Sequence, residues 1–139
     1  MEAFIRRPTK STPYVHLDTR EGIYLLAGRS IPINAEQFFS PILNWIEELS
    51  ESSVSVIDFR FRFDFFNIAS SKRILFILYK LADLQKLGVK VNIRWMYERM
   101  DEDMLEIGQD YSVMIENLNF FFEEYDHVER QEQSYAKLG

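Results

Sequence analysis

The acidic run from Asp101 to Glu106 holds the residue types most able to do chemistry in this 139-residue chain. Its carboxylates could bind a divalent cation through oxygen, and a small metal-assisted enzyme would use Asp101, Asp103 and Glu106. The run lacks the glycine and the ligand spacing of a calcium loop. Carboxylates also favour the N-terminus of a helix, where they cap exposed amides and complement the helix dipole. We therefore predict a helix start here, with the metal-assisted enzyme as the alternative function.

Other catalytic chemistry has no support in the residue pattern. The two histidines, His16 and His127, are isolated from each other, and each is expected at the surface. The sequence has no cysteine, no Gly-x-Ser-x-Gly motif and no glycine-rich phosphate loop among its five glycines. We predict no catalytic residue, no cofactor and no metal, and hence a protein that is not an enzyme.

Polar residues from Asn67 to Ser71 lie where a predicted strand meets a predicted helix. The open N–H groups at a helix start accommodate a phosphate, and the added charge would disrupt a partner surface centred there. The simpler interpretation is that Asn67, Ser70 and Ser71 only cap the helix. Taken alone, the residue types favour the capping interpretation.

Strict alternation predicts two central strands. From Ser53 to Phe65, apolar and charged residues take turns along the chain. The apolar set is Ile57, Phe59, Phe61, Phe63 and Phe65, and the charged set is Asp58, Arg60, Arg62 and Asp64. The segment from Val89 to Tyr97 alternates in the same way. A period of two predicts strands with one buried face and one wetter face.

The remaining segments complete an α/β pattern. We predict strands at 12–19, 23–27 and 119–125, and helices at about 34–49, 70–87 and 101–116. The order β-β-α-β-α-β-α-β predicts a mixed, largely parallel sheet with helices mainly on one face, analogous to the STAS arrangement of anti-sigma-factor antagonists. The result is a single α/β domain over residues 12–126. An N-terminal arm (1–11) and a polar C-terminal tail (127–139) are expected to fray.

The composition limits the possible partners. A net charge of -6 argues against nucleic acid, because phosphate neutralisation requires a basic surface. The longest apolar runs are far too short to span a membrane, and the first residues lack the apolar core of a signal peptide. We therefore predict a cytoplasmic protein that neither binds nucleic acid nor inserts into a membrane.

Basic residues recur on the polar sides of the two alternating strands. They are Arg60, Arg62, Lys90 and Arg94. If the strands are neighbours, these residues form a basic stripe that could dock an acidic protein partner. The alternative is a solvated sheet face on which nearby aspartates neutralise part of the charge.

Three stretches of the sequence resemble the SiaC family of bacterial regulatory phosphoproteins. Residues 28–45 contain G-R-S-I-P-I-N-A followed by F-F and P-I-L-N-W. Residues 65–72 read F-F-N-I-A-S-S-K, similar to the family's Y-F-N-T-S-S-x-K. Residues 95–108 read W-M-Y-E-R-M-D-E-D-M-L-E-I-G, similar to W-Y-Y-E-x-x-D-x-D-M-x-E-x-G. In order and spacing, the resemblance extends over residues 12–125.

The resemblance implies a partner switch. Family members are phosphorylated by a protein kinase and dephosphorylated by a PP2C-type phosphatase, and the unphosphorylated form activates a diguanylate cyclase. The resulting cyclic di-GMP promotes aggregation or biofilm formation. The counterpart of the phosphorylated threonine is Ile68, which has no hydroxyl, and the next serine is replaced by Ala69. A glutamate of the first motif is replaced by Ile33.

Two hypotheses follow from the missing threonine. Either Ser70 or Ser71 has become the phosphoacceptor, or the protein is locked in a state like the unphosphorylated form. We favour the second, because isoleucine has the β-branched shape of unmodified threonine. The switch site is then Ile68 with the neighbours Asn67, Ala69, Ser70, Ser71 and Lys72. The predicted partner contacts are Arg29, Ser30, Asn34, Arg60, Arg62, Arg94, Asp101 and Asp103.

Overall fold

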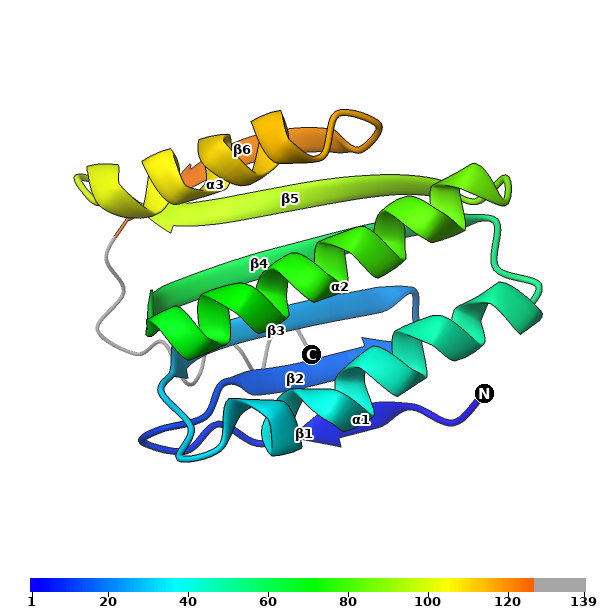
Figure 1. The fold of residues 1–139 in the computed structure, drawn as a ribbon, viewed down its shortest axis with the longest axis horizontal. Helices are drawn as coiled ribbons and strands as arrows, with labels where there is room; N and C mark the ends of the chain where they lie inside the picture. The colour runs from blue at the N-terminus through cyan, green and yellow to red at the C-terminus, as the bar shows by residue number, and fades with distance from the viewer. Residues whose placement is uncertain (127–139) are drawn as a thin grey trace.

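A computed structural model describes residues 1–126, which form one mixed sheet with the helices on one of its faces (Figure 1). The strands are β1 (Phe4–Arg6), β2 (Tyr14–Asp18), β3 (Ile23–Ser30), β4 (Val56–Phe66), β5 (Lys90–Glu98) and β6 (Asn119–Tyr125). The helices are α1 (Ala35–Glu48), α2 (Ile68–Lys86) and α3 (Glu102–Met114), with a short 3₁₀ turn (Leu49–Glu51) after α1. The predicted tail, residues 127–139, lies outside the described residues.

The strands lie side by side in chain order, from β1 to β6. The first three pair antiparallel, and β3 to β6 pair parallel. Each parallel connection carries one helix, and all three helices cover the same face (Figure 1). The predicted α/β class, with a mixed, largely parallel sheet and helices on one face, is confirmed. Within residues 1–126, no helix has the length and apolar character needed to cross a membrane. The cytoplasmic location stays a prediction.

The N-terminal arm differs from the expectation. Residues 4–6 form the edge strand β1, and Phe4 packs against the core. The Trp45 indole N–H of α1 donates to the Glu2 carbonyl at 2.8 Å and holds the chain ahead of the strand. A strand of three residues is too short to show a period, so tertiary contacts determine its existence.

The predicted buried face of β4 is correct up to Phe63. The residues Ile57, Phe59, Phe61 and Phe63 are buried under the helices. The pairing of β3 with β4 then skips one residue of β4, because Gly28 pairs with Phe63 and Arg29 with Phe65. This β-bulge turns Phe65 outward, against the prediction, and packs Phe66 on the core instead. The bulge therefore changes which side chains reach the edge next to α2.

Helix α3 packs directly on Trp95 of β5. The Trp95 indole N–H donates to the Met104 carbonyl at 2.9 Å. A Cβ atom on Gly108 would lie 2.3 Å from Trp95 Cδ1, so only glycine allows this close approach. The glycine that weakens the helical pattern of the sequence therefore has a packing role.

Candidate functional site

The start of α2 lies at the edge of the sheet where the parallel strands end. Asn67 caps the helix, because its Oδ1 accepts the N–H of Ser70 at 2.9 Å. The Asn67 N–H donates to the carbonyl of Ser30, the last residue of β3, at 3.1 Å. The capping interpretation therefore holds for Asn67, and the backbone ties this turn to the neighbouring strand.

Ser70 and Ser30 form a buried hydroxyl pair. Their Oγ atoms are 2.9 Å apart, and Ser70 Oγ lies 3.1 Å from the Ser30 carbonyl oxygen, to which it can donate. Both side chains are fully buried. The prediction that Ser30 contacts a partner is therefore wrong for its side chain, which instead anchors α2. Ser70 is buried as well, so a kinase cannot reach its hydroxyl in this conformation.

The other serine of the turn is also engaged. The Ser71 hydroxyl donates to the Ile68 carbonyl at 2.6 Å. From α3, the Tyr111 hydroxyl donates to the Ser71 carbonyl at 2.8 Å. Burial raises the pKa of Tyr111 above its ordinary value, so the phenol keeps the proton that it donates. The three sequence motifs do not include Tyr111, and no local signal predicts its contact.

Ile68 is the first residue of α2, and its side chain is 89% exposed. Three other large apolar side chains are exposed in the segments that end or follow β3, β4 and β5: Ile33, Phe65 and Met100. Met100 is 86% exposed and has a φ of 78°, a left-handed conformation that is uncommon outside glycine. Because adjacent parallel strands end at the same edge of a sheet, these four residues lie at one edge, which we call the apolar edge.

Polar residues predicted at the site surround the apolar edge. Arg29 is exposed, and its guanidinium lies 5.5 Å from the centre of the Phe65 ring. Lys72 and Ala69 are exposed on the first turn of α2. Asn34 is exposed as well and caps α1 by accepting the Gln37 N–H at 3.0 Å. The structure thus brings the first and second motifs together at one edge.

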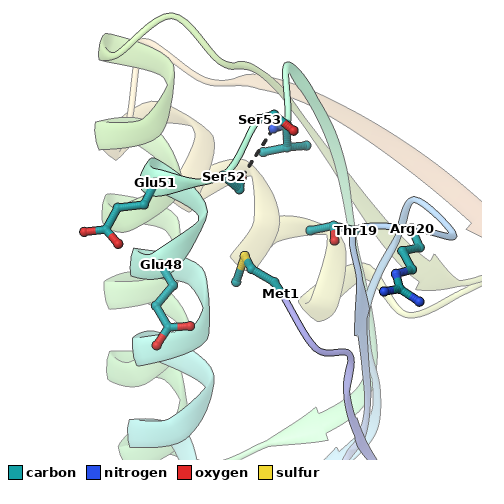
Figure 2. A pocket seen from close by; sticks show the side chains of 8 residues that line it. Met1, Thr19, Arg20, Glu48, Glu51, Ser52 and Ser53 are labelled. Atoms are coloured by element: carbon teal, nitrogen blue, oxygen red, sulfur yellow. Dashed lines mark hydrogen bonds between the residues drawn. The ribbon is translucent and has the colours of Figure 1, made fainter.

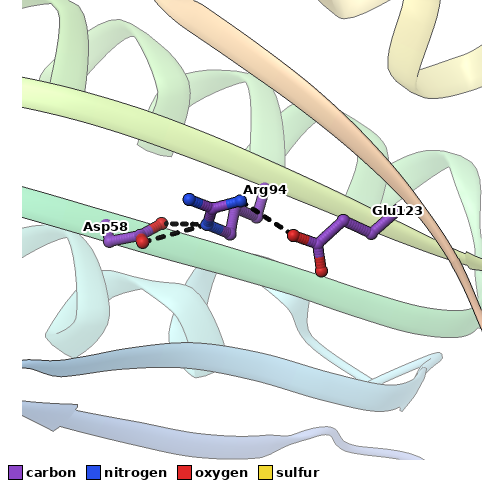
Figure 3. A network of polar contacts seen from close by, with 3 residues as sticks. All are labelled: Asp58, Arg94 and Glu123. Carbon is purple, nitrogen blue, oxygen red and sulfur yellow. Dashed lines mark hydrogen bonds and ion pairs between the residues drawn. The ribbon is translucent and has the colours of Figure 1, made fainter.

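The predicted basic stripe is not a free basic surface. The Nε atom of Arg94 lies 2.9 Å from both carboxylate oxygens of Asp58, and its Nη1 lies 2.8 Å from Glu123 Oε1 (Figure 3). Hydrogen bonds to Asp58 and then to Glu123 raise the pKa of Arg94 above its ordinary value. Arg62 is buried, with its guanidinium 4.1 Å from the centre of the Tyr125 ring. The stripe therefore fails for Arg62 and Arg94.

Arg60 and Lys90 remain exposed on this face. Another polar residue predicted at the surface, His16, is buried on β2, with Nδ1 2.9 Å from the Tyr14 hydroxyl. The alternation of residue types could predict neither the burial of His16 nor the continued exposure of Arg60 and Lys90, because a period of two identifies a face of the sheet but not what packs on it.

Replacing Arg94 with methionine should lower the free energy of unfolding by about 1 kcal/mol at low salt. The variant leaves Asp58 and Glu123 without their shared cation on a partly buried face. Urea titrations at low and high salt would measure the loss, which should shrink as salt screens the carboxylates. Lys80→Met, which removes the exposed bridge to Glu47, is the control and should cost less. Equal losses in the two variants would contradict the prediction.

The acidic run begins α3. Asp101 Oδ1 accepts the Met104 N–H at 3.1 Å, which confirms the predicted helix start. Asp103 and Glu106 are exposed on the helix. Residues 1–126 contain no group of three or more acidic or histidine side chains placed to hold a metal ion.

A hollow of about 610 Å³ lies at the opposite end of the sheet, beside the end of α1. Met1, Arg20, Glu48 and Glu51 are among its lining residues. Figure 2 shows Arg20 across the opening from Glu48 and Glu51, with the Glu51 side chain pointing away from it. Ligand sites usually combine an apolar lining with a few convergent polar groups. This hollow lacks that convergence, so the apolar edge is the better candidate site.

The three motifs lie within the part of the chain that matches a known protein family. The model of the SiaC family of regulatory phosphoproteins matches residues 6–125. The chain belongs to the SiaC family. The family assigned from the three motifs is therefore confirmed, and the apolar edge carries the position at which the family pattern has threonine.

Relatives of known sequence or structure agree with this assignment. The uncharacterized protein PA14_02130 of Pseudomonas aeruginosa (strain UCBPP-PA14) is 27% identical over 103 residues, which are 74% of this chain and 82% of that protein. Apo-SiaC from Pseudomonas aeruginosa has the same fold, with a TM-score of 0.80 at 24% identity, over 88% of this chain and 99% of its own.

A third relative is seen with a partner. The structure of the diguanylate cyclase SiaD in complex with its activator SiaC, from Pseudomonas aeruginosa, matches with a TM-score of 0.77 at 26% identity. The match covers 89% of this chain and 99% of that chain. The SiaC fold thus occurs in a regulatory complex with a cyclase.

Proposed function

We propose that this protein binds and activates a diguanylate cyclase through the apolar edge. The observation that carries the proposal is the exposure of Ile68 at the family's switch position, on a turn held by hydrogen bonds from Ser30 and Tyr111. An exposed apolar surface of this kind is typical of a protein-binding site. The relative that is bound to the cyclase SiaD as its activator supports the class of partner.

We further propose that the protein is locked in a state like the unphosphorylated form. Ile68 has no hydroxyl, Ser70 is buried, and the Ser71 hydroxyl is bonded to a backbone carbonyl. A phosphate on this turn would place a dianion against the apolar edge. With no hydroxyl at residue 68 and both neighbouring serine hydroxyls engaged in hydrogen bonds, the apolar edge stays available for its partner at all times.

For the kinase and the PP2C-type phosphatase of the family switch, we propose roles that do not involve phosphate transfer to this chain. A cognate kinase that recognises the apolar edge would bind this chain without transferring phosphate to residue 68. The chain would then compete with a switchable relative for the kinase, and the phosphatase would have no substrate on it.

Reconstitution with the purified diguanylate cyclase of the same organism tests the proposed function. Binding is measured by calorimetry, and cyclic di-GMP production from GTP is followed with and without this protein. Addition of the protein should raise the rate of cyclic di-GMP synthesis and saturate with the binding curve. If the cyclase neither binds nor responds, the proposed function is wrong.

Ile68→Thr should restore phosphorylation. Residue 68 is exposed on the first turn of the helix, where a kinase can reach a hydroxyl and open N–H groups tolerate the phosphate. Incubation with the cognate kinase and ATP, followed by mass spectrometry, should show phosphate on the introduced threonine and none on the wild-type chain. Phosphorylation of wild type at Ser71 to the same extent would overturn the locked state.

A further inference from the structure

The first turn of α2, which presents Ile68, is held from two sides. From β3, Ser30 accepts the Asn67 N–H through its carbonyl and pairs its hydroxyl with Ser70. From α3, Tyr111 donates its hydroxyl to the Ser71 carbonyl. The second contact joins residues 40 positions apart and ties α3 to this turn.

Packing fixes the Tyr111 side chain. Its ring is buried and meets Trp95 edge-on, with ring centroids 5.5 Å apart and planes at 71°. Trp95 is itself held by the hydrogen bond from its indole to Met104 and by the close approach of Gly108. The Tyr111 hydroxyl therefore reaches Ser71 from a rigid support rather than from a mobile side chain.

The turn needs such support because helix starts are the weakest parts of a helix. The first N–H groups have no partner four residues earlier, and end turns open at low free-energy cost. Here Asn67 supplies two partners, its side-chain oxygen for the Ser70 N–H and its carbonyl for the Ser71 N–H. A partner that binds Ile68 needs the turn closed. If the turn were open in the free protein, it would have to close on binding, and the free energy of closing would lower the affinity.

We propose that Tyr111 is a positioning residue, whose hydroxyl keeps the first turn of α2 closed and thereby presents Ile68 to the partner. This inference rests on the proposed function for the identity of the partner. It also makes α3 part of the binding site without any contact between Tyr111 and the partner, because the tyrosine acts through Ser71.

Tyr111→Phe isolates the hydroxyl, because the ring remains to pack on Trp95. The Ser71 carbonyl also lies in the helical ladder, so the variant leaves no unpaired carbonyl. Ile42→Val is the matched control, because it is a small deletion from the buried core in α1, outside both α2 and α3. Amide hydrogen exchange is measured on the free proteins, and affinity for the purified diguanylate cyclase is measured by calorimetry.

In Tyr111→Phe, exchange at the amides of residues 70–72 should be about fivefold faster, and affinity should fall by a similar factor. Ile42→Val should leave the affinity unchanged, and it should speed exchange at residues 70–72 only as far as it lowers the stability of the whole fold. Unchanged exchange at residues 70–72 would show that the Tyr111 hydroxyl does not keep the turn closed. Faster exchange with wild-type affinity would show that closing the turn has no role in binding. If wild type does not bind the cyclase, the proposed function fails, and with it the positioning role. The exchange data would then still show whether the hydroxyl closes the turn.

Discussion

Gly108→Ala is expected to lower the free energy of unfolding by about 3 kcal/mol, a large change for one methyl group. The added Cβ would lie 2.3 Å from Trp95 Cδ1 and 2.5 Å from Nε1, distances at which one of the two must move. Trp95 is buried among aromatic rings and bonded to Met104, so α3 must shift instead. On an open helix the same substitution would stabilise by up to about 1 kcal/mol, so the sign of the change tests the packing.

Urea denaturation of Gly108→Ala beside Gln109→Ala measures the effect. Gln109 is the exposed neighbour on the same helix, and its replacement should change the free energy of unfolding by less than about 0.5 kcal/mol. A Gly108→Ala midpoint equal to or above that of wild type would show that α3 does not pack on Trp95 as described.

Ile68→Glu is expected to weaken binding to the diguanylate cyclase by about 100-fold or more. The carboxylate would be buried in the interface without a partner, which costs several kcal/mol. The fold should be unaffected, because residue 68 is exposed and an acidic side chain at a helix start is favourable. Lost affinity would therefore report on the interface and not on unfolding.

Leu87→Glu is the matched control for this variant. Leu87 is also a large exposed apolar residue, but it lies at the other end of α2. Calorimetric titration of both variants should give wild-type affinity for Leu87→Glu and a severe loss for Ile68→Glu. Equal affinities in both variants would place the interface elsewhere on the molecule.

The amino-acid sequence predicted the features that depend on residues close together in the chain. The period of two predicted the buried face of β4 up to Phe63. The capping residue types at Asn67 and Asp101 do cap α2 and α3, although α2 begins at Ile68, two residues before the predicted position 70. The three motifs, each local in sequence, identified the SiaC family. The amino-acid sequence also determined directly that residue 68 cannot carry a phosphate, because isoleucine has no hydroxyl.

Other features were decided by which strands become neighbours. The bulge opposite β3 turned Phe65 outward, and the pairing of β5 with β4 and β6 placed Arg94 between Asp58 and Glu123, which removed the expected basic stripe. The two contacts that hold the Ile68 turn, Ser30 with Ser70 and Tyr111 with Ser71, each join residues 40 positions apart. Propensities and caps depend on near neighbours in the chain, whereas burial and pairing depend on groups that meet only after the chain has folded.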